Sequence, residues 1–122
     1  MTADTATITS FITDRLDADE AAAEQALERG FGGWEWLADH GINFEARTHI
    51  ARHHPAHVLR TVAALRAIVE LHREDAPHLA GQQFCTTCHD YNRHDGVEWP
   101  CPTIRALAAI WSDSDEWREE WR

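Results

Sequence analysis

The sequence predicts a mainly α-helical fold, a small helical domain with one irregular loop and one short hairpin within that loop. Two observations predict this fold. Apolar residues recur at helical spacing in several stretches. Proline and glycine, which interrupt helices, gather in residues 74–100. For a chain of 122 residues, we expect one domain over residues 1–122.

The first helix is expected over residues 7–28, where one apolar stripe runs between acidic faces. Gly30 is a natural stop for this helix. Residues 31–43 are expected to form a loop or a short irregular segment, in which Trp34 and Trp36 cover the core. The stripe consists of Ile8, Phe11, Ile12, Leu16, Ala23 and Leu27.

A short helix is expected over residues 44–53, and it ends at His54 because the residue before Pro55 avoids helical backbone angles. Proline suits the first turn of the next helix, expected over residues 55–73. That helix carries one seam at spacings of 4, 3, 4 and 3 residues, which predicts that it packs against the first helix and the helix after Cys101. The seam is Val58, Val62, Leu65, Val69 and His72.

Two further helices are expected near the C-terminus. One begins at Cys101 and Pro102 and presents Ile104, Leu107, Ala108 and Trp111 on one face. Asp113 caps a last helix, in which Trp117 and Trp121 lie one turn apart.

The three cysteines form a metal-binding pattern, because Cys85 and Cys88 are separated by two residues and Cys101 follows twelve residues later. Two thiolates at this spacing can grip one tetrahedral ion. Cys101 precedes a helix start, which favours a thiolate. An odd number of cysteines argues against a disulfide framework. The loop is therefore predicted to bind zinc, which completes the fold class: mainly α, with an irregular zinc-binding loop.

A fourth ligand is needed, and His72 is the first choice because it continues the apolar seam and so points inward. A buried histidine bonded to a backbone carbonyl is the alternative interpretation of His72. The other candidates for the fourth ligand are His49, His53, His78 and His89.

Other interpretations of the cysteines stay open. Cys85-Thr86-Thr87-Cys88-His89 fits the haem-attachment pattern C-x-x-C-H, but attachment follows export and the third cysteine would be unexplained. An iron–sulfur cluster, free thiols and a thiol redox sensor are the remaining alternatives.

His49 and His53 are four residues apart and would share a helix face, as metal-binding histidine pairs do. A metal-dependent enzyme using these histidines is thus an alternative function. Against it, Ile50 stands where H-E-x-x-H has glutamate, and the sequence has no G-x-S-x-G, phosphate-binding loop or dinucleotide fingerprint. The simpler interpretation is that the histidines of this segment cap helices and face solvent.

The formal net charge is −10, from 21 acidic and 11 basic residues, and all the basic residues are arginine. This balance argues against a general nucleic-acid binder. The basic residues gather over residues 47–73, which fits either a solvated helix face or a site for an acidic partner. No apolar run is long enough for a membrane helix, and the N-terminus does not look like a secretory signal. We therefore expect a cytoplasmic protein.

Three stretches resemble the motifs of a family of small uncharacterised actinobacterial and actinophage proteins. Residues 49–60, HIARHHPAHVLR, resemble HIARHDPARVLRE; residues 100–108, PCPTIRALA, resemble PCPTLRALA; and residues 118–122 match REEWR. Residues 11–21, FITDRLDADEA, are similar to the opening FLRARLDEDEAA. His54 and His57 stand where the family has aspartate and arginine. The resemblance implies a shared fold and a source, and no activity.

The sequence as a whole favours a zinc-stabilised binding or regulatory protein, not an enzyme. Zinc is expected on Cys85, Cys88, Cys101 and His72, where three thiolates and an imidazole close the coordination sphere. We expect it to act through a protein partner, in a phage or mobile-element setting.

Overall fold

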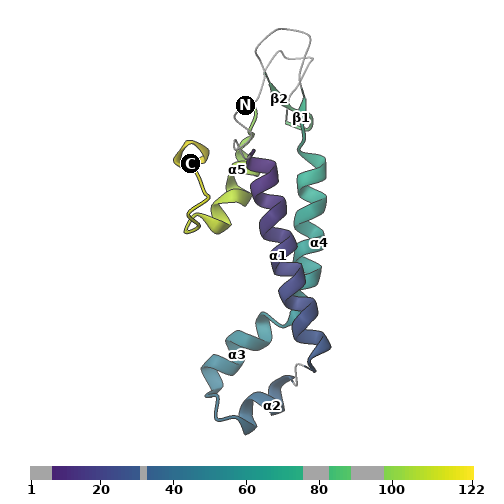
Figure 1. The fold of residues 1–122 in the computed structure, drawn as a ribbon, viewed down its shortest axis with the longest axis vertical. Helices are drawn as coiled ribbons and strands as arrows, with labels where there is room; N and C mark the ends of the chain where they lie inside the picture. Colours follow the sequence, from purple (N-terminus) through teal and green to yellow (C-terminus); the bar gives the residue numbers. More distant parts are fainter. Residues whose placement is uncertain (1–6, 31–32, 76–82, 89–97) are drawn as a thin grey trace. The chain divides into compact units, whose positions relative to one another are not determined.

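The computed structural model describes residues 7–30, 33–75, 83–88 and 98–122, and there the chain is mainly α-helical, as the sequence predicts (Figure 1). The prediction of a mainly helical fold with a short hairpin is confirmed. The elements in chain order are α1 (Ile8–Glu28), α2 (Gly33–Asp39), α3 (Phe44–Arg52), α4 (Pro55–Leu71), β1 (Glu74–Asp75), β2 (Phe84–Cys85), α5 (Pro102–Ala108) and the 3₁₀ helices η1 (Ala109–Trp111) and η2 (Glu119–Trp121).

The chain divides into two compact units. The cysteine unit comprises Met1–Arg15 and Leu65–Arg122, and the histidine unit comprises Leu16–Ala64. The expectation of a single domain over residues 1–122 stays a prediction.

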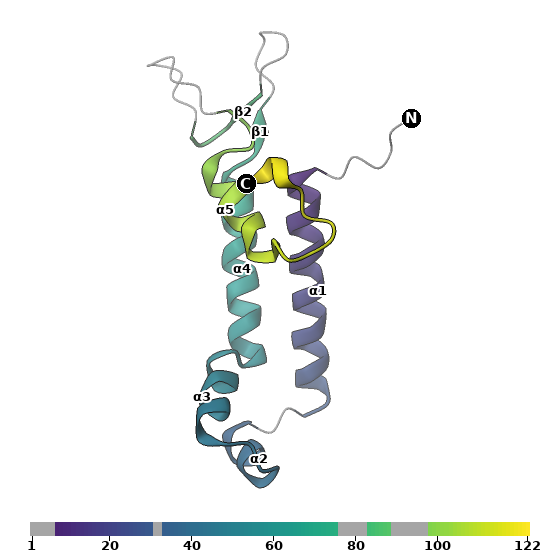
Figure 2. The same ribbon diagram turned by 90° about the vertical axis from the view of Figure 1, so that its left-hand side faces the viewer.

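In the cysteine unit, the first turns of α1 lie beside the last turns of α4 (Figures 1 and 2). The apolar stripe predicted for this part of α1 is buried, since Ile8, Phe11 and Ile12 are at most 3% exposed. The Phe11 ring packs against Trp121 from the C-terminal end, with ring centroids 5.0 Å apart. This contact joins the two ends of the sequence within one apolar core.

The small antiparallel sheet is the predicted hairpin, with Glu74 opposite Cys85. A bridge between Phe84 and Glu98 extends the pairing to the segment that leads into α5. The strand pairing and the bridge therefore bring the segment of Cys85 next to both the end of α4 and the residues that lead to Cys101 (Figure 2).

Helix α5 begins where the sequence predicts. Cys101 is the N-cap residue, Pro102 occupies the first turn, and the Arg105 N–H donates to the Cys101 carbonyl at 3.0 Å. Ile104 and Ala108, both predicted for the inner face, have no exposed surface.

The prediction of a last helix capped by Asp113 is wrong. The described chain forms η1, then turns, then η2, and residues 113–118 are not helical. The hydroxyl of Ser114 accepts from the Glu116 N–H at 3.2 Å, and the Trp117 N–H donates to the Ser114 carbonyl at 3.1 Å. Such local side-chain bonds give the backbone an alternative to the helix. Trp121 is nevertheless buried.

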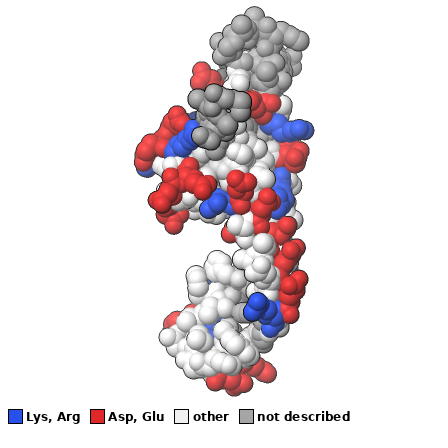
Figure 3. Space-filling view, in the orientation of Figure 1, with Lys and Arg blue, Asp and Glu red and all other residues white. Residues whose placement is uncertain are grey.

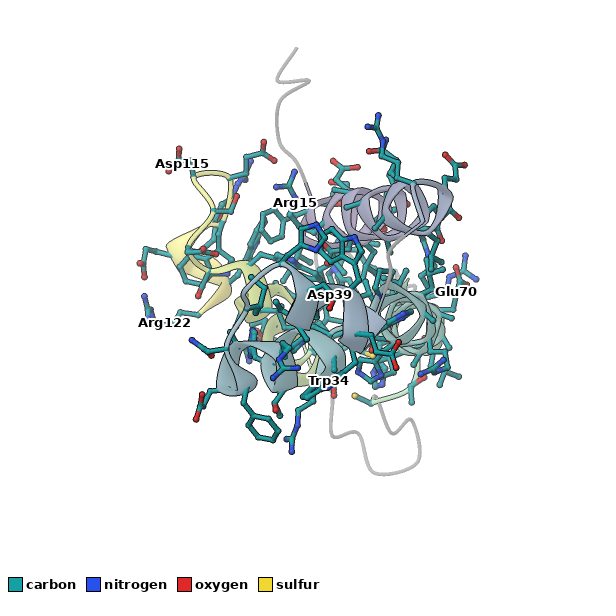
Figure 4. All side chains as sticks on the ribbon, turned by 90° about the horizontal axis from the view of Figure 1, so that it is seen from below. Arg15, Trp34, Asp39, Glu70, Asp115 and Arg122 are labelled. Carbon is teal, nitrogen blue, oxygen red and sulfur yellow. The ribbon has the colours of Figure 1, made fainter. Side chains whose placement is uncertain are left out.

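In the histidine unit, the expected loop over residues 31–43 is corrected by helix α2. Leu37 of α2 is buried, and α2 packs against α3, so tertiary contact stabilises a helix too short to persist alone. Trp34 and Trp36 do not cover the core, since they are 40% and 46% exposed. Trp34 is labelled in Figure 4.

Helix α3 matches its predicted range to one residue. Asn43 caps it, with the side-chain oxygen accepting from the Ala46 N–H at 2.8 Å. His54 begins α4 in a similar way, because its Nδ1 accepts from the Ala56 N–H at 3.0 Å. The prediction that histidines of this segment cap helices is thereby confirmed for His54.

The apolar seam of α4 is only partly buried. Val62 is 2% exposed, whereas Leu65 and Val69 are half-buried. The helix ends at Leu71, two residues before the predicted end. None of the described helices combines the length and the apolar character needed to cross a membrane.

Candidate metal centre

His72 is held at the end of α4 by backbone hydrogen bonds. Its N–H donates to the carbonyls of Ile68 and Val69, at 3.1 and 3.2 Å. The helix thus fixes the residue even though its regular part ends at Leu71. The side chain is half-buried, which agrees with its place at the end of the apolar seam.

The turn that carries Cys85 and Cys88 is tied to the same helix end by the two threonines between them. The Thr87 hydroxyl donates to the Leu71 carbonyl. The Thr86 N–H donates to the Arg73 carbonyl at 2.8 Å, and the Thr86 hydroxyl accepts from the Arg73 N–H at 3.2 Å. Sequence reasoning missed this role of the threonines, although their position inside the C-x-x-C motif was a signal.

Cys101 comes from the third segment, at the start of α5. Its sulfur makes no capping hydrogen bond to the helix, so the thiol is free for other partners. Cys85 and Cys101 are completely buried, Cys88 is half-buried, and none of the three is in a disulfide.

These three segments converge on one point. The sulfurs of Cys85, Cys88 and Cys101 lie 3.4, 3.5 and 3.6 Å from Nδ1 of His72. All four ligand atoms lie within 4.8 Å of one another. One ring nitrogen carries at most one proton, so three such contacts cannot all be hydrogen bonds donated by it.

The distances fit a tetrahedral ion. Zinc–sulfur bonds of about 2.3 Å and zinc–nitrogen bonds of about 2.0–2.1 Å separate sulfur from nitrogen by roughly 3.6 Å in a tetrahedron. The observed range of 3.4–3.6 Å reaches that separation. The cluster of His72, Cys85, Cys88 and Cys101 is therefore close enough to hold a metal ion, and its donor set suits zinc.

The charges that the cluster would carry as thiolates also favour a bound cation. Burial and the two neighbouring thiols raise the pKa of Cys88 to about 12. Burial also raises the pKa of Cys85, but hydrogen bonds from the backbone of Cys88 and Thr87 outweigh it, so the pKa of Cys85 lies below its usual value. Three thiolates at this spacing repel one another, and a divalent cation would offset that repulsion.

The other candidate fourth ligands belong to the histidine unit or fall outside the described residues. His49 and His53 belong to the histidine unit, where their ring centroids are 4.6 Å apart. Among the described residues, they are not joined by a third ligand, since the cysteine cluster is the one group of three or more ligands found there. His78 and His89 fall outside the described residues.

A cavity of about 330 Å³ lies beside His72, between the start of α1, the end of α4 and Trp99. Its described lining contains one histidine, His72, so it does not show the converging histidines expected of a hydrolytic metal pocket. The lining residues are Thr7, Thr9, Val69, Glu70, His72, Arg73, Glu74 and Trp99.

Fold and site together define a small, mainly helical protein with one His-Cys₃ cluster that joins a short hairpin to two helices. The chain belongs to the family of unknown function DUF6221, which it matches over residues 5–122. Neither the curated proteins nor the solved structures compared with the chain include a match.

Proposed function

We propose that His72, Cys85, Cys88 and Cys101 bind one structural Zn²⁺. The observation that carries this proposal is the placement of four ligand atoms within 4.8 Å of one another. Three thiolates and one imidazole fill a tetrahedral zinc site, and such closed sites stabilise folds instead of binding substrate. The ion would join the end of α4, the hairpin and the start of α5, which are far apart in the sequence.

Several features favour zinc over the alternative metals and over a redox pair. The ligand atoms are close enough to share one ion, whereas an iron–sulfur cluster spreads its ligands around a larger core. Soft thiolates with one imidazole in a tetrahedron are a typical zinc donor set. A zinc site also gives a role to Cys101 and His72, whereas a redox pair of Cys85 and Cys88 would leave both without one.

The test is metal analysis of the full chain, produced without added metal, together with its variants. We expect about one zinc per chain in the wild type, and a loss of most of the zinc in Cys88→Ser and His72→Ala. His40→Ala is the matched control, since that ring bonds to the Trp36 carbonyl at 2.8 Å in the other unit. Wild-type protein without zinc, whose three thiols all react freely, would overturn the proposal.

With a closed metal site, the protein itself is proposed to act by binding a protein partner, in the phage or mobile-element setting that its resemblance suggests. Trp34, Trp36 and Phe44 support this role, because they are 40–62% exposed and aromatic side chains are enriched at protein interfaces. The Arg47 guanidinium lies 4.7 Å from the Trp34 ring centroid, so arginine joins the same surface. The formal charge of −10 disfavours nucleic acid as the partner.

Partner binding is tested by pull-down from the native host with the wild type and with Trp36→Ala. A partner retained by the wild type and released by the variant supports the proposal. The control is Ile110→Ala, which alters another exposed apolar residue, in the cysteine unit. If all three proteins captured the partner equally, the exposed aromatic residues Trp34, Trp36 and Phe44 would have no role in binding it.

A further inference from the structure

His49 and His53 form a pair at the end of α3. His49 lies in the last turn of the helix, and His53 is its C-cap residue. Both side chains are exposed, and their ring centroids are 4.6 Å apart with the planes inclined by 46°. Two imidazoles one helical turn apart can direct a nitrogen each toward a shared ion.

No ring nitrogen of this pair is engaged in a hydrogen bond with another described residue, whereas each of the other described histidines has at least one ring nitrogen in a polar contact. His40 bonds to a backbone carbonyl, His54 accepts from a backbone N–H, and His57 contacts the Thr61 hydroxyl at 3.5 Å. In the described part of the chain, the rings of His49 and His53 have no hydrogen bond or ion pair, and their contact is with each other.

The place of the pair on the helix also favours a cation. The negative end of the α3 helix dipole lies at its last turn. The α3 helix has nine residues, and the N–H of its C-cap residue, His53, bonds back to Ile50 and Ala51. His53 therefore lies just past the last helical turn and is held to it by these backbone bonds. On the face shown in Figure 3, most of the surface over α2 and α3 is uncharged, although Arg52 also belongs to the last turn of α3.

We propose that His49 and His53 chelate one divalent transition-metal ion of the borderline class, such as Ni²⁺, Cu²⁺ or Zn²⁺. These ions prefer imidazole nitrogen, whereas Mg²⁺ and Ca²⁺ prefer oxygen. Two protein nitrogens leave coordination positions open to water or to a donor from another molecule. This site therefore differs in kind from the closed cysteine cluster and does not depend on it.

Nickel is the suitable probe, because Cu²⁺ would oxidise thiols and Zn²⁺ would be confused with the ion at the cysteines. The zinc-loaded full chain is titrated with Ni²⁺ near neutral pH, by calorimetry. We expect one nickel site in the wild type, and at least a tenfold loss of nickel affinity in His49→Ala and in His53→Ala. His57→Ala, in the neighbouring helix of the same unit, should bind nickel as the wild type does.

A two-histidine chelate requires both rings, so the two variants must lose affinity together. If only one of them does, nickel is bound by a single histidine and the proposal fails. It also fails if the wild type binds no nickel or if His57→Ala loses as much affinity as the other variants. Nickel at the thiols would reveal itself by thiolate-to-metal absorption and by released zinc, so a failure of the cysteine site is distinguished from a failure of the histidine pair. Far-UV circular dichroism checks that the variants, altered at exposed positions, remain folded.

Discussion

Cys88 is a residue at which zinc binding is expected to remove a proton. Its pKa of about 12 means that the metal-free thiol is protonated near neutral pH, whereas zinc binds the thiolate. We therefore expect zinc binding to release at least one proton and the zinc affinity to fall as the pH is lowered. Calorimetry in two buffers with different ionisation enthalpies measures the release. An observed enthalpy that is the same in both buffers would contradict it.

Thr87 does not bind the metal in our proposal but positions the residues that do. Its hydroxyl donates to the Leu71 carbonyl, at the end of the helix that carries His72. Groups that orient metal ligands typically contribute a factor of about 10–100 to metal affinity. We expect Thr87→Val to lower zinc affinity by roughly tenfold. Competition with a chromophoric chelator measures the change.

Thr48→Val is the matched control for that measurement. The Thr48 hydroxyl also donates to a backbone carbonyl, that of Phe44 at 2.9 Å, but within α3 of the other unit. If the two variants lost zinc affinity equally, the Thr87 hydrogen bond would have no specific role in ordering the turn of Cys85 and Cys88.

Helix α5 packs into the core through a few buried side chains, and Ile104 is the largest of them. It has no exposed surface, whereas Ile110, six residues later, is 55% exposed. Replacing Ile104 by alanine should lower the free energy of unfolding by about 2–5 kcal/mol, and Ile110→Ala by less than about 0.5 kcal/mol. Urea denaturation of both variants checks this contrast. Similar losses would mean that the inner face of α5 is not part of the core.

The apolar face of α4 is less buried than the spacing of its apolar residues predicts. Leu65 is half-buried, while Val62 is 2% exposed. A cost of about 2–5 kcal/mol applies to a fully buried leucine, so Leu65→Ala should fall below that range. The physical reason is that regular spacing places apolar residues on one face of the helix but does not by itself supply neighbours that cover that face.

At the scale of the whole molecule, the ion is expected to organise the cysteine unit more than the helices. The hairpin has two residues in each strand, too little to be stable by itself. Structural zinc contributes about 10–16 kcal/mol in small peptides. We therefore expect a chelator to lower the melting temperature sharply, while most of the helical circular dichroism signal survives at low temperature.

Hydrogen exchange gives the direct measurement of this effect. Amides of residues 83–88 and 98–101 should lose protection when zinc is removed, and those in the middle of α1 should keep most of theirs. If protection in the cysteine turn is unchanged after verified zinc removal, the ion does not order that segment.

Much of the fold could be predicted because the signals are local. Ile8, Phe11 and Ile12 repeat at helical spacing, and Gly30 stops the helix with φ at +76°, a conformation that favours glycine. The spacing of Cys85 and Cys88 likewise indicates a turn that can present two sulfurs to one ion. Each of these signals lies within a few residues of the feature that it predicts.

The sequence could not predict α2 or the 3₁₀ turns at the C-terminus, because contacts with other segments of the chain decide them. α2 has seven residues and is held by its packing on α3. Trp121 packs against Phe11. The spacing of Trp117 and Trp121 suggests a regular helix, but Trp121 makes this contact without one. The threonines of the cysteine turn are a similar case, since their partners at the end of α4 are 13 to 16 residues away.

Helix periodicity and ligand spacing are properties of short segments, so the sequence predicts a mainly helical protein and singles out Cys85, Cys88, Cys101 and His72 as candidate metal ligands. The approach of His72 Nδ1 to within 3.4–3.6 Å of the three sulfurs, in contrast, is seen only in the folded chain. The reason is geometric: each ligand is placed by its own segment, but the distance between segments depends on the hairpin, the Phe84–Glu98 bridge and the threonine bonds that close the long loop.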